Sequence, residues 1–457
     1  MDRWFPSGYG FRRWAVVFAA GVAVLAVGLA MWITNLYRMY VVDNSGTTFL
    51  YFATLQFIPH PWRELLVGVV GLAFLMWGAL GISRATRNAA ARGKPLGVPV
   101  FALMRQARNA NGPRIVAIGG GTGMPTLLRG IKEVTDNITA VVNVVDDGGS
   151  SGRLRRDLGI LPPGDFRNNL VALSDVEPLM MELFQYRFEG AGELEGHSFG
   201  NLYLVAMTGV TGNFEQAISE SSRVLAVRGK VLPASLENIE LYAELQNGDI
   251  VRGESVIPRT EVPLKRVFMR PAHASGYPEA ISEILNAEII VLGPGSLFTS
   301  IMPPMLVEDI ARAVKRNTTA LKVYICNVAT QPGETDGFGV IEHVRALQDH
   351  IGPGLFDYVI YNSNLESEKL IKPEWNVTAI KLDESATNRF PKLHFVPADV
   401  VRDDNPLRHD PAKLATAVME LYETAGGKNS TTNRVRENRN GTAASGAEDR
   451  GSLTKAL

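Results

Sequence analysis

The stretch IVAIGGGTGMPTLLRGIKEV, residues 115–134, is the most informative part of the sequence for the fold. In it a short apolar run ends abruptly in glycines, and a helical pattern follows. The spacing predicts a strand over residues 114–118, a glycine loop and a helix. Glycines permit positive φ angles and close approach of the backbone to a ligand, and a helix N-terminus favours an anion such as phosphate. We therefore expect a nucleotide or another phosphorylated ligand here, with a purely structural glycine turn as the alternative. The residues expected to contact the ligand are Gly120, Gly121, Thr122 and Gly123.

This loop matches neither standard phosphate-binding fingerprint. Met124 stands where GxGxxG requires its last glycine, and no Gly-Lys-Ser/Thr follows as a P-loop requires. A dinucleotide-dependent oxidoreductase is therefore the least favoured enzyme class.

A second apolar run, residues 138–145, suits a parallel strand that is buried on both faces. It ends in Asp146 and Asp147, which are candidates for a ribose or sugar contact or for a Mg²⁺ site. A capped turn is the alternative, because Asp, Gly and Ser all favour turns. Anion-binding groups are also expected among the residues that follow, namely Gly148, Gly149, Ser150, Ser151 and Arg153. A third polar cluster, again with a helix cap as the alternative, comprises Asp165, Arg167 and Asn168.

Two further strands are expected at residues 288–292 and 321–326, and each is followed by a glycine-rich or polar segment. Because ligands bind beyond the carboxyl ends of the strands in an open parallel sheet, all four segments should line one crevice. Another strand at 357–361 and helices at 305–315 and 340–350 complete a doubly wound α/β fold. The later segments add Gly293, Pro294, Gly295, Ser296, Asn327, Gln331 and Glu334 to the expected ligand contacts, and the HSFGN segment adds His197 and Asn201.

Six motifs make the chain similar to a known family. They are GGGTG at 119–123, VDDGGSSGRLR at 145–155, LPPGDFRNNLVALSD at 161–175, HSFGNL at 197–202, VLGPGSLFTSIMP at 291–303 and YICNVATQPGETDGF at 324–338. Over about residues 112–425, these motifs resemble the YvcK family of gluconeogenesis factors within the CofD-like superfamily.

The resemblance implies a CofD-like Rossmann-type domain that binds a UDP-sugar, such as UDP-N-acetylglucosamine, and regulates cell-envelope synthesis and cell shape. It also implies an alternative, a Mg²⁺-dependent phosphotransferase of the 2-phospho-L-lactate transferase type that uses a nucleotide-linked donor. For that chemistry the candidate catalytic residues are Asp146, Asp147 and Asp165, with Asp146 and Asp147 as metal ligands. The segment GGSSGRLRRDLGILPPGDFRN departs from the transferase pattern.

Between about residues 224 and 270 the pattern changes to short β-rich pieces separated by Asn-Gly and Pro turns. This pattern predicts an antiparallel insertion that covers the crevice or forms an oligomer interface. Its charged residues Arg252 and Glu254 are expected on solvated strand faces.

Residues 1–100 contain two apolar stretches, about 14–35 and 65–82, each long enough to cross a bilayer. Basic residues precede the first stretch and follow the second, which places both termini and the main domain in the cytoplasm. We expect a two-span hairpin in the cell membrane. A cleaved signal peptide is the alternative for the first stretch only.

The composition excludes several classes of protein. A single cysteine among 457 residues excludes an intramolecular disulfide. A net charge of −1 lacks the excess of basic residues that is typical of nucleic-acid-binding proteins. Cys326 is expected in a buried apolar role. Residues 426–457 lack an apolar face and are expected to be a disordered tail. A homo-oligomer is possible, and Mg²⁺ is the one cofactor that the residues suggest.

Overall fold

The structure is a computed structural model that describes residues 9–38, 59, 62–90, 109–175, 178–190 and 192–425. The chain divides into two compact units, residues 1–108 and 109–457. The tail expected at 426–457 lies outside the described residues.

The first unit contains helices α1 (Tyr9–Arg38) and α3 (Trp62–Ala90), which cover both predicted spans. The two backbones pack closely, because a Cβ built on Gly78 would lie 2.9 Å from the Phe18 Cα. Among the residues that the structure describes, no helix is both long enough and apolar enough to cross a membrane. The structure therefore does not confirm the transmembrane hairpin.

The second unit is built on a seven-stranded sheet with the order β10-β9-β8-β7-β1-β2-β3, in which every pair runs parallel. The strands are β1 (Ile115–Gly119), β2 (Ile138–Val142), β3 (Lys230–Pro233), β7 (Ile289–Leu292), β8 (Leu321–Ile325), β9 (Tyr358–Asn362) and β10 (His394–Ala398). The chain runs outward from β1 to β3, then returns to β7 on the other side of β1. This reversal makes the β1–β7 boundary the topological switch point of a Rossmann-like α/β sheet.

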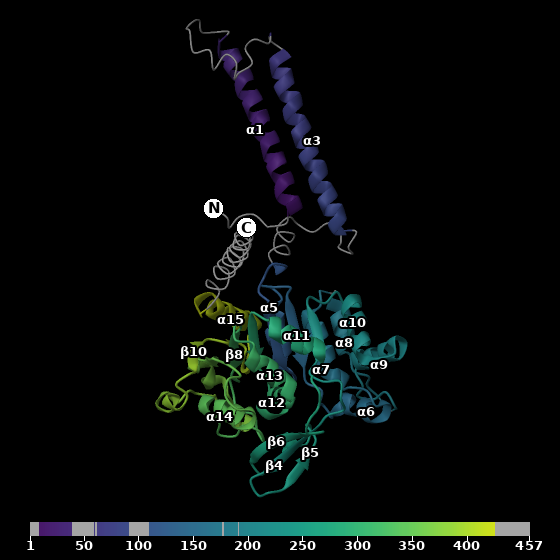
Figure 1. Ribbon diagram of the computed structural model, residues 1–457, viewed down its shortest axis with the longest axis vertical. Coiled ribbons are helices and arrows are strands. Elements are labelled where there is room, and N and C mark those ends of the chain that lie inside the picture. Colours follow the sequence, from purple (N-terminus) through teal and green to yellow (C-terminus); the bar gives the residue numbers. More distant parts are fainter. Residues whose placement is uncertain are drawn as a thin grey trace, which may run out of the picture. The chain divides into compact units, whose positions relative to one another are not determined.

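Helices flank this sheet (Figure 1). One group whose members contact one another comprises α5 (Gly123–Ile131), α7 (Pro163–Leu173) and α15 (Pro411–Ala425). A second group comprises α11 (Pro278–Asn286), α12 (Met302–Leu306), α13 (Glu308–Arg316) and α14 (Val340–Ile351). The remaining helices are α6 (Gly149–Leu158), α8 (Pro178–Gln185), α9 (Phe199–Thr211) and α10 (Phe214–Val224), with a π-helical turn at Leu297–Ile301.

The core lies at the centre of the sheet. Every residue of β1, β2 and β7 is buried, which explains why these strands read as continuous apolar runs and not as alternating ones. Leu127, Leu128 and Ile131 of α5 pack on the core and are fully buried. Cys326 is buried and free, as its apolar surroundings in the sequence predict.

The antiparallel part is smaller than the range 224–270 that its sequence suggested. β3 pairs in parallel with β2 and so belongs to the main sheet. The antiparallel sheet contains only β4 (Glu240–Leu245), β5 (Ile250–Arg252) and β6 (Leu264–Arg270), in the order β5-β4-β6. Near the C-terminus, β11 (Val401–Arg402) and β12 (Asn405–His409) form a hairpin that brings residues of β12 beside α5.

Candidate functional site

A cavity of about 450 Å³ opens where the loops after β1, β7 and β8 meet. Its position at the carboxyl ends of the central strands is the one where doubly wound folds bind ligands. The predicted site residues that line it are Thr122, Gly123, Pro294, Gly295, Ser296, Asn327 and Gln331.

Two glycine loops touch at the floor of this cavity. A Cβ on Gly123 would lie 2.3 Å from the Pro294 carbonyl oxygen, so only glycine permits the contact. Gly121 adopts φ +64°, a left-handed conformation that side chains disfavour. The GGGTG segment therefore requires glycine for close packing as well as for access to a ligand.

Asn327 fixes the second loop. Its Oδ1 accepts the Gly295 N–H at 3.3 Å, and its Nδ2 donates to the Gly295 carbonyl at 2.8 Å. The two ends of the amide thus hold the peptide units on both sides of Gly295 in place. Asn327 therefore lines the cavity and also positions the Gly293–Ser296 loop through both ends of its amide.

Arg408 of β12 also lines the cavity, and the sequence analysis missed it. Its guanidinium donates to the Thr122 Oγ1 at 2.7 Å while the side chain remains exposed. A guanidinium at the mouth of a glycine-lined cavity suits a phosphate oxygen, which it can bind with two parallel hydrogen bonds. No local motif surrounds Arg408, so only the folded hairpin reveals its place.

Asp165 lies directly beneath the first glycine loop. Its Oδ2 accepts the Gly121 N–H at 2.9 Å, and a Cβ on Gly120 would lie 2.5 Å from that same oxygen. Burial, followed by the neighbouring charge of Asp146, raises the pKa of Asp165 to about 7. Asp165 is thus poised to gain or lose a proton near neutrality.

The paired aspartates point to different partners. The Asp146 Oδ1 accepts the Gly148 N–H at 3.0 Å, and burial raises the pKa of Asp146. The Asp147 Oδ1 instead accepts the Ser255 N–H at 2.9 Å, from the segment that follows β5. Asp147 therefore anchors the antiparallel sheet to the site.

The carboxylates of this site do not form a complete set of metal ligands. Within the described ranges, no group of three or more His, Cys, Asp or Glu side chains is arranged to hold a metal ion. Mg²⁺ commonly uses one or two carboxylates together with water and substrate phosphates. Asp146 and Asp165 would therefore fit Mg²⁺ only with help from the oxygens of a bound ligand.

Glu254 is a second residue that the sequence analysis placed wrongly. Glu254 lies in the turn after β5 and is half-buried, so it is not on a solvated strand face. Burial, together with the charges of Asp146 and Asp165, raises its pKa to about 9. Arg252 does match the expectation, because it is exposed and pairs with Glu240. The alternation of β5 ends at Gly253, which adopts φ +107° and turns the chain towards Asp147.

Glu334 supports the second loop from behind. It is buried and accepts hydrogen bonds from the Thr299 hydroxyl at 2.7 Å and from the Phe298 N–H at 3.2 Å. Burial raises the pKa of Glu334 to about 7. Gln331 donates to the same carboxylate at 3.2 Å and also lines the cavity. Gln331 and Glu334 therefore connect the wall of the candidate cavity to the π-helical turn at Leu297–Ile301.

Ser150, His197 and Asn201 form a buried hydrogen-bonded group. The Ser150 hydroxyl lies 2.9 Å from the His197 Nδ1 and accepts from the Asn201 Nδ2 at 3.0 Å. Burial, followed by the charge of Arg153, lowers the pKa of His197. These three side chains bond to one another and do not line the cavity, so they hold α6 against α9, while the buried Asn201 Oδ1 has no hydrogen-bond partner among the described residues. Ser151 has a similar role, since its hydroxyl accepts the Gly164 N–H at 3.0 Å.

The two arginines that were expected to neutralise phosphate bind protein groups. Arg167 donates to the hydroxyl of Ser198 and, at 2.9 Å, to the Asn168 Oδ1. Burial lowers the pKa of Arg167 to about 10. Arg153 donates to the Glu195 carbonyl. Neither arginine lines the cavity. Gly149, the first residue of α6, adopts φ +46°.

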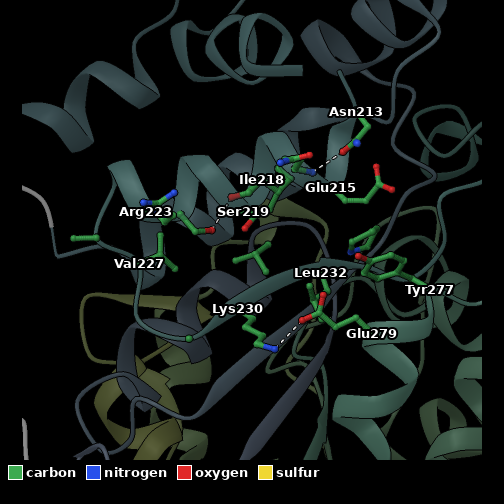
Figure 2. A pocket seen from close by; sticks show the side chains of 16 residues that line it. Asn213, Glu215, Ile218, Ser219, Arg223, Val227, Lys230, Leu232, Tyr277 and Glu279 are labelled. Atoms are coloured by element: carbon green, nitrogen blue, oxygen red, sulfur yellow. Dashed lines mark hydrogen bonds and ion pairs between the residues drawn. The ribbon is translucent and has the colours of Figure 1, made fainter. Parts of the chain in front are cut away.

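A larger cavity, of about 660 Å³, lies between α10 and the edge strand β3. Figure 2 shows Lys230 directed towards Glu279 across this cavity, and the two form an ion pair at 2.7 Å. None of the predicted site residues lines it. The smaller cavity is therefore the better candidate, because it brings together the glycine loops, Arg408 and the polar ends of the strands.

Comparison with known proteins gives a consistent family assignment. Residues 115–400 match the family model described as 2-phospho-L-lactate transferase CofD. The gluconeogenesis factor of Bacillus subtilis is 46% identical over 317 residues, which cover 68% of this chain and 98% of its own. A relative from Nostoc sp., also described as a gluconeogenesis factor, is 41% identical over 429 residues and covers 92% of each chain.

A solved structure agrees with this assignment. The crystal structure of a UPF0052-family protein from Bacillus halodurans is 46% identical and superposes with a TM-score of 0.64. It covers 68% of this chain and 99% of that one. The match therefore spans almost all of that solved chain.

Proposed function

This chain belongs to the CofD family and, within it, to the gluconeogenesis factors, and on that basis we propose that it binds a UDP-sugar of the UDP-N-acetylglucosamine type. The observation that carries the proposal is the cavity of about 450 Å³ at the β1–β7 switch point, which two glycine loops and Arg408 line. Glycine backbones at a strand–helix junction and an unburied guanidinium suit a diphosphate.

In this proposal the residues around the cavity have different roles. The loop around Gly123, at the start of α5, offers backbone N–H groups to the diphosphate. Arg408 neutralises its charge, and Thr122 holds the guanidinium at the cavity mouth. Asp146 and Asp165 do not line this cavity, and Asp165 accepts the Gly121 N–H from behind the glycine loop. For these carboxylates to bind ribose or sugar hydroxyls, or Mg²⁺ beside the phosphates, the ligand has to extend past that loop.

We propose that binding, and not turnover, is the output. The Asp146 Oδ1 accepts the Gly148 N–H and the Asp147 Oδ1 accepts the Ser255 N–H, so the two aspartates are not held as a preformed pair of metal ligands, and we favour binding over phosphoryl transfer. A ligand that favours one conformation of the loops can then change the affinity for a partner in cell-envelope synthesis, and so influence cell shape.

The proposed function is tested by titrating the full-length protein with UDP-N-acetylglucosamine by calorimetry, with and without Mg²⁺, and then analysing the ligand. Saturable binding with the ligand recovered unchanged supports a sensor. Mg²⁺-dependent consumption of the ligand or of another nucleotide-linked donor supports the transferase instead. The absence of binding under both conditions rejects the UDP-sugar.

We also propose that the first unit attaches the chain to the cell membrane, with both termini and the larger unit in the cytoplasm. The proposal is supported by large apolar side chains that are exposed on both helices, among them Val16, Leu29, Leu65 and Met76. Close helix packing through glycine, as at Gly78, is also common in membrane hairpins. Carbonate-washed membranes should retain the full chain and should release a variant that lacks residues 1–100.

A further inference from the structure

A further cavity, of about 240 Å³, lies between α6 and the antiparallel sheet, whose elements are labelled in Figure 1. Its walls come from the loop after β2, from α6, and from β4 and the end of β5. The charged residues that line it are Asp147, Arg155, Arg156, Glu240 and Arg252. None of its lining residues lines the candidate cavity, so this site is separate from the one proposed for the UDP-sugar.

Positive charge is in excess in this lining. Three arginines and two carboxylates give a net charge of +1. Glu240 already has protein partners, because its Oε1 accepts from Arg252 and its Oε2 accepts from the Tyr242 hydroxyl at 3.0 Å. The Asp147 Oδ1 accepts the Ser255 N–H at 2.9 Å. Since both carboxylates are held by donors of the protein and the net charge is positive, the cavity favours an anion over a cation.

Arg155 is a buried cation whose hydrogen bonds all go to neutral groups. It is 8% exposed, and its guanidinium donates to the Asn238 Oδ1 at 2.6 and 2.9 Å, to the Val144 carbonyl at 3.3 Å and to the Ile239 carbonyl. Burial lowers the pKa of Arg155, and nearby acidic charges oppose this shift from beyond contact distance. Buried arginines are normally paired with an anion. In the described ranges the protein supplies Arg155 with no direct anionic partner.

Arg156 offers a free guanidinium to the same cavity. It is exposed, and it forms no hydrogen bond or ion pair in the part of the chain that the structure describes. Arg156 belongs to α6, whereas Arg252, which is also exposed, belongs to β5. Guanidinium groups bind phosphate oxygens through two parallel hydrogen bonds. A tetrahedral anion between α6 and β5 can therefore accept hydrogen bonds from both elements.

The size of the cavity limits the ligand. A volume of about 240 Å³ is below the range of about 300–1,000 Å³ that is typical of pockets for drug-sized molecules. A single phosphate group fits such a volume, but a whole nucleotide sugar does not. A planar carboxylate presents its oxygens in one plane, whereas the oxygens of a phosphate point in several directions and suit guanidinium groups on two elements.

We propose that this cavity binds a phosphate group, as inorganic phosphate or as the phosphate of a small phosphomonoester, between Arg156 and Arg252 and beside the buried Arg155. The bound group joins α6 to β5. It therefore holds the antiparallel sheet in place next to the hydrogen bond between Asp147 and the Ser255 N–H. The inference does not rest on the proposed UDP-sugar, because it concerns a different cavity.

The first test measures the melting temperature of the full-length protein in detergent against the concentration of inorganic phosphate, with sodium chloride at equal ionic strength as the reference. Phosphate should raise the melting temperature in a saturable way, because a ligand that binds only the native state stabilises it. Arg156→Gln should weaken the apparent affinity at least tenfold. Without phosphate, this variant should melt as the wild type does, since Arg156 is exposed and has no partner among the described residues.

Arg316→Gln is the matched control for Arg156→Gln. Arg316 is exposed and lies in the last turn of α13, as Arg156 lies in the last turn of α6, but it does not line the cavity. Arg316→Gln should bind phosphate as the wild type does. The proposal is overturned if the wild type shows no saturable response in the millimolar range, or if Arg156→Gln and the wild type have equal affinity.

The second test separates this site from the candidate cavity, whose glycine loops could also bind phosphate. Phosphate should slow hydrogen–deuterium exchange in α6 and β5, and its binding should persist in Arg408→Ala. Binding that is lost in Arg408→Ala and retained in Arg156→Gln would place the ion in the candidate cavity and overturn the proposal. Failure of UDP-N-acetylglucosamine to bind would reject the proposed function and leave this inference intact.

The third test identifies the source of the phosphate group with glycerol 3-phosphate as a second probe. Tighter binding of glycerol 3-phosphate than of inorganic phosphate assigns the cavity to a phosphomonoester, and the reverse order assigns it to the free ion. Arg156→Gln should weaken the binding of both probes. Acetate that binds as tightly as either probe would overturn the assignment to phosphate.

Discussion

The Arg408 guanidinium lies 2.7 Å from the Thr122 Oγ1, although 286 residues separate them in the sequence. This hydrogen bond joins the hairpin β11–β12 to the N-terminus of α5 and places a cation beside the first glycine loop. In the proposed function this arrangement supplies the cation that the first glycine loop lacks in its own sequence, from the far end of the domain.

Arg408→Ala should weaken the binding of UDP-N-acetylglucosamine by at least tenfold, because a hydrogen bond to a charged group contributes about 1.5–3 kcal/mol. Calorimetry on the full-length variant measures the change. Arg402→Ala is the matched control, because Arg402 belongs to the same hairpin but pairs with Asp404 and does not line the cavity. Equal affinity in the two variants would remove Arg408 from the site.

Gly123→Ala should push the two loops apart, because the added Cβ would lie 2.3 Å from the Pro294 carbonyl oxygen. We expect a loss of stability of about 1–3 kcal/mol, which is typical of overpacking, together with weaker binding. Gly209→Ala is the control, since a Cβ there meets nothing within 4 Å. Differential scanning calorimetry of both variants checks the prediction, and identical melting temperatures would contradict it.

Asn327→Asp should weaken ligand binding through the loop that Asn327 positions. The substitution replaces the Nδ2 donor, which bonds to the Gly295 carbonyl at 2.8 Å, with a second acceptor. Two facing acceptors that are partly buried should cost about 1–3 kcal/mol. Asn286→Asp is the control, because its Nδ2 bonds to the Ser282 carbonyl at an exposed site. Urea unfolding and ligand titration of both variants separate loop damage from a general loss of stability.

Asp165 should make stability depend on pH. Its pKa in the folded protein is about 7, whereas an unperturbed aspartate has a pKa of about 3.9. The native state therefore binds the proton more tightly than the unfolded state does, and the free energy of unfolding should fall as pH rises from about 4 to about 7. Asp165→Asn should reduce this slope while its side-chain oxygen still accepts the Gly121 N–H.

Urea unfolding at a series of pH values measures this effect. In Asp165→Asn the free energy of unfolding should still fall somewhat as pH rises, because the pKa values of Glu254 and Glu334 are also raised in the folded protein. Asp157→Asn, at a surface position, should leave the wild-type slope unchanged. A slope that is equal in wild type and Asp165→Asn would show that Asp165 is ionised in the folded protein throughout this range.

The sequence predicted the central sheet well, because its signals are local. Nearly continuous apolar runs at β1, β2 and β7 are typical of parallel strands that are buried on both faces, and the residues that follow each run mark the strand ends. The glycine loop and the Gly293–Ser296 segment lie together, as expected from their places after neighbouring strands.

What the sequence did not predict depends on contacts between distant residues. Arg408 has no local pattern, and Glu254 reads as one charged residue among many at the end of an alternating strand. Arg408 reaches the first glycine loop only when the β11–β12 hairpin has folded. Glu254 reaches the aspartates only when the antiparallel sheet packs against the loop after β2. The direction of Asp147, which is set by the Ser255 N–H, is equally invisible in the pair Asp146–Asp147.

The most direct test of the central claim is hydrogen–deuterium exchange of the full-length protein with and without saturating UDP-N-acetylglucosamine. Binding in the candidate cavity should slow exchange in the loops at residues 119–123 and 293–296 and in β12 around Arg408. Unchanged exchange in these three segments, or protection confined to α10 and β3 around the larger cavity of Figure 2, would contradict it.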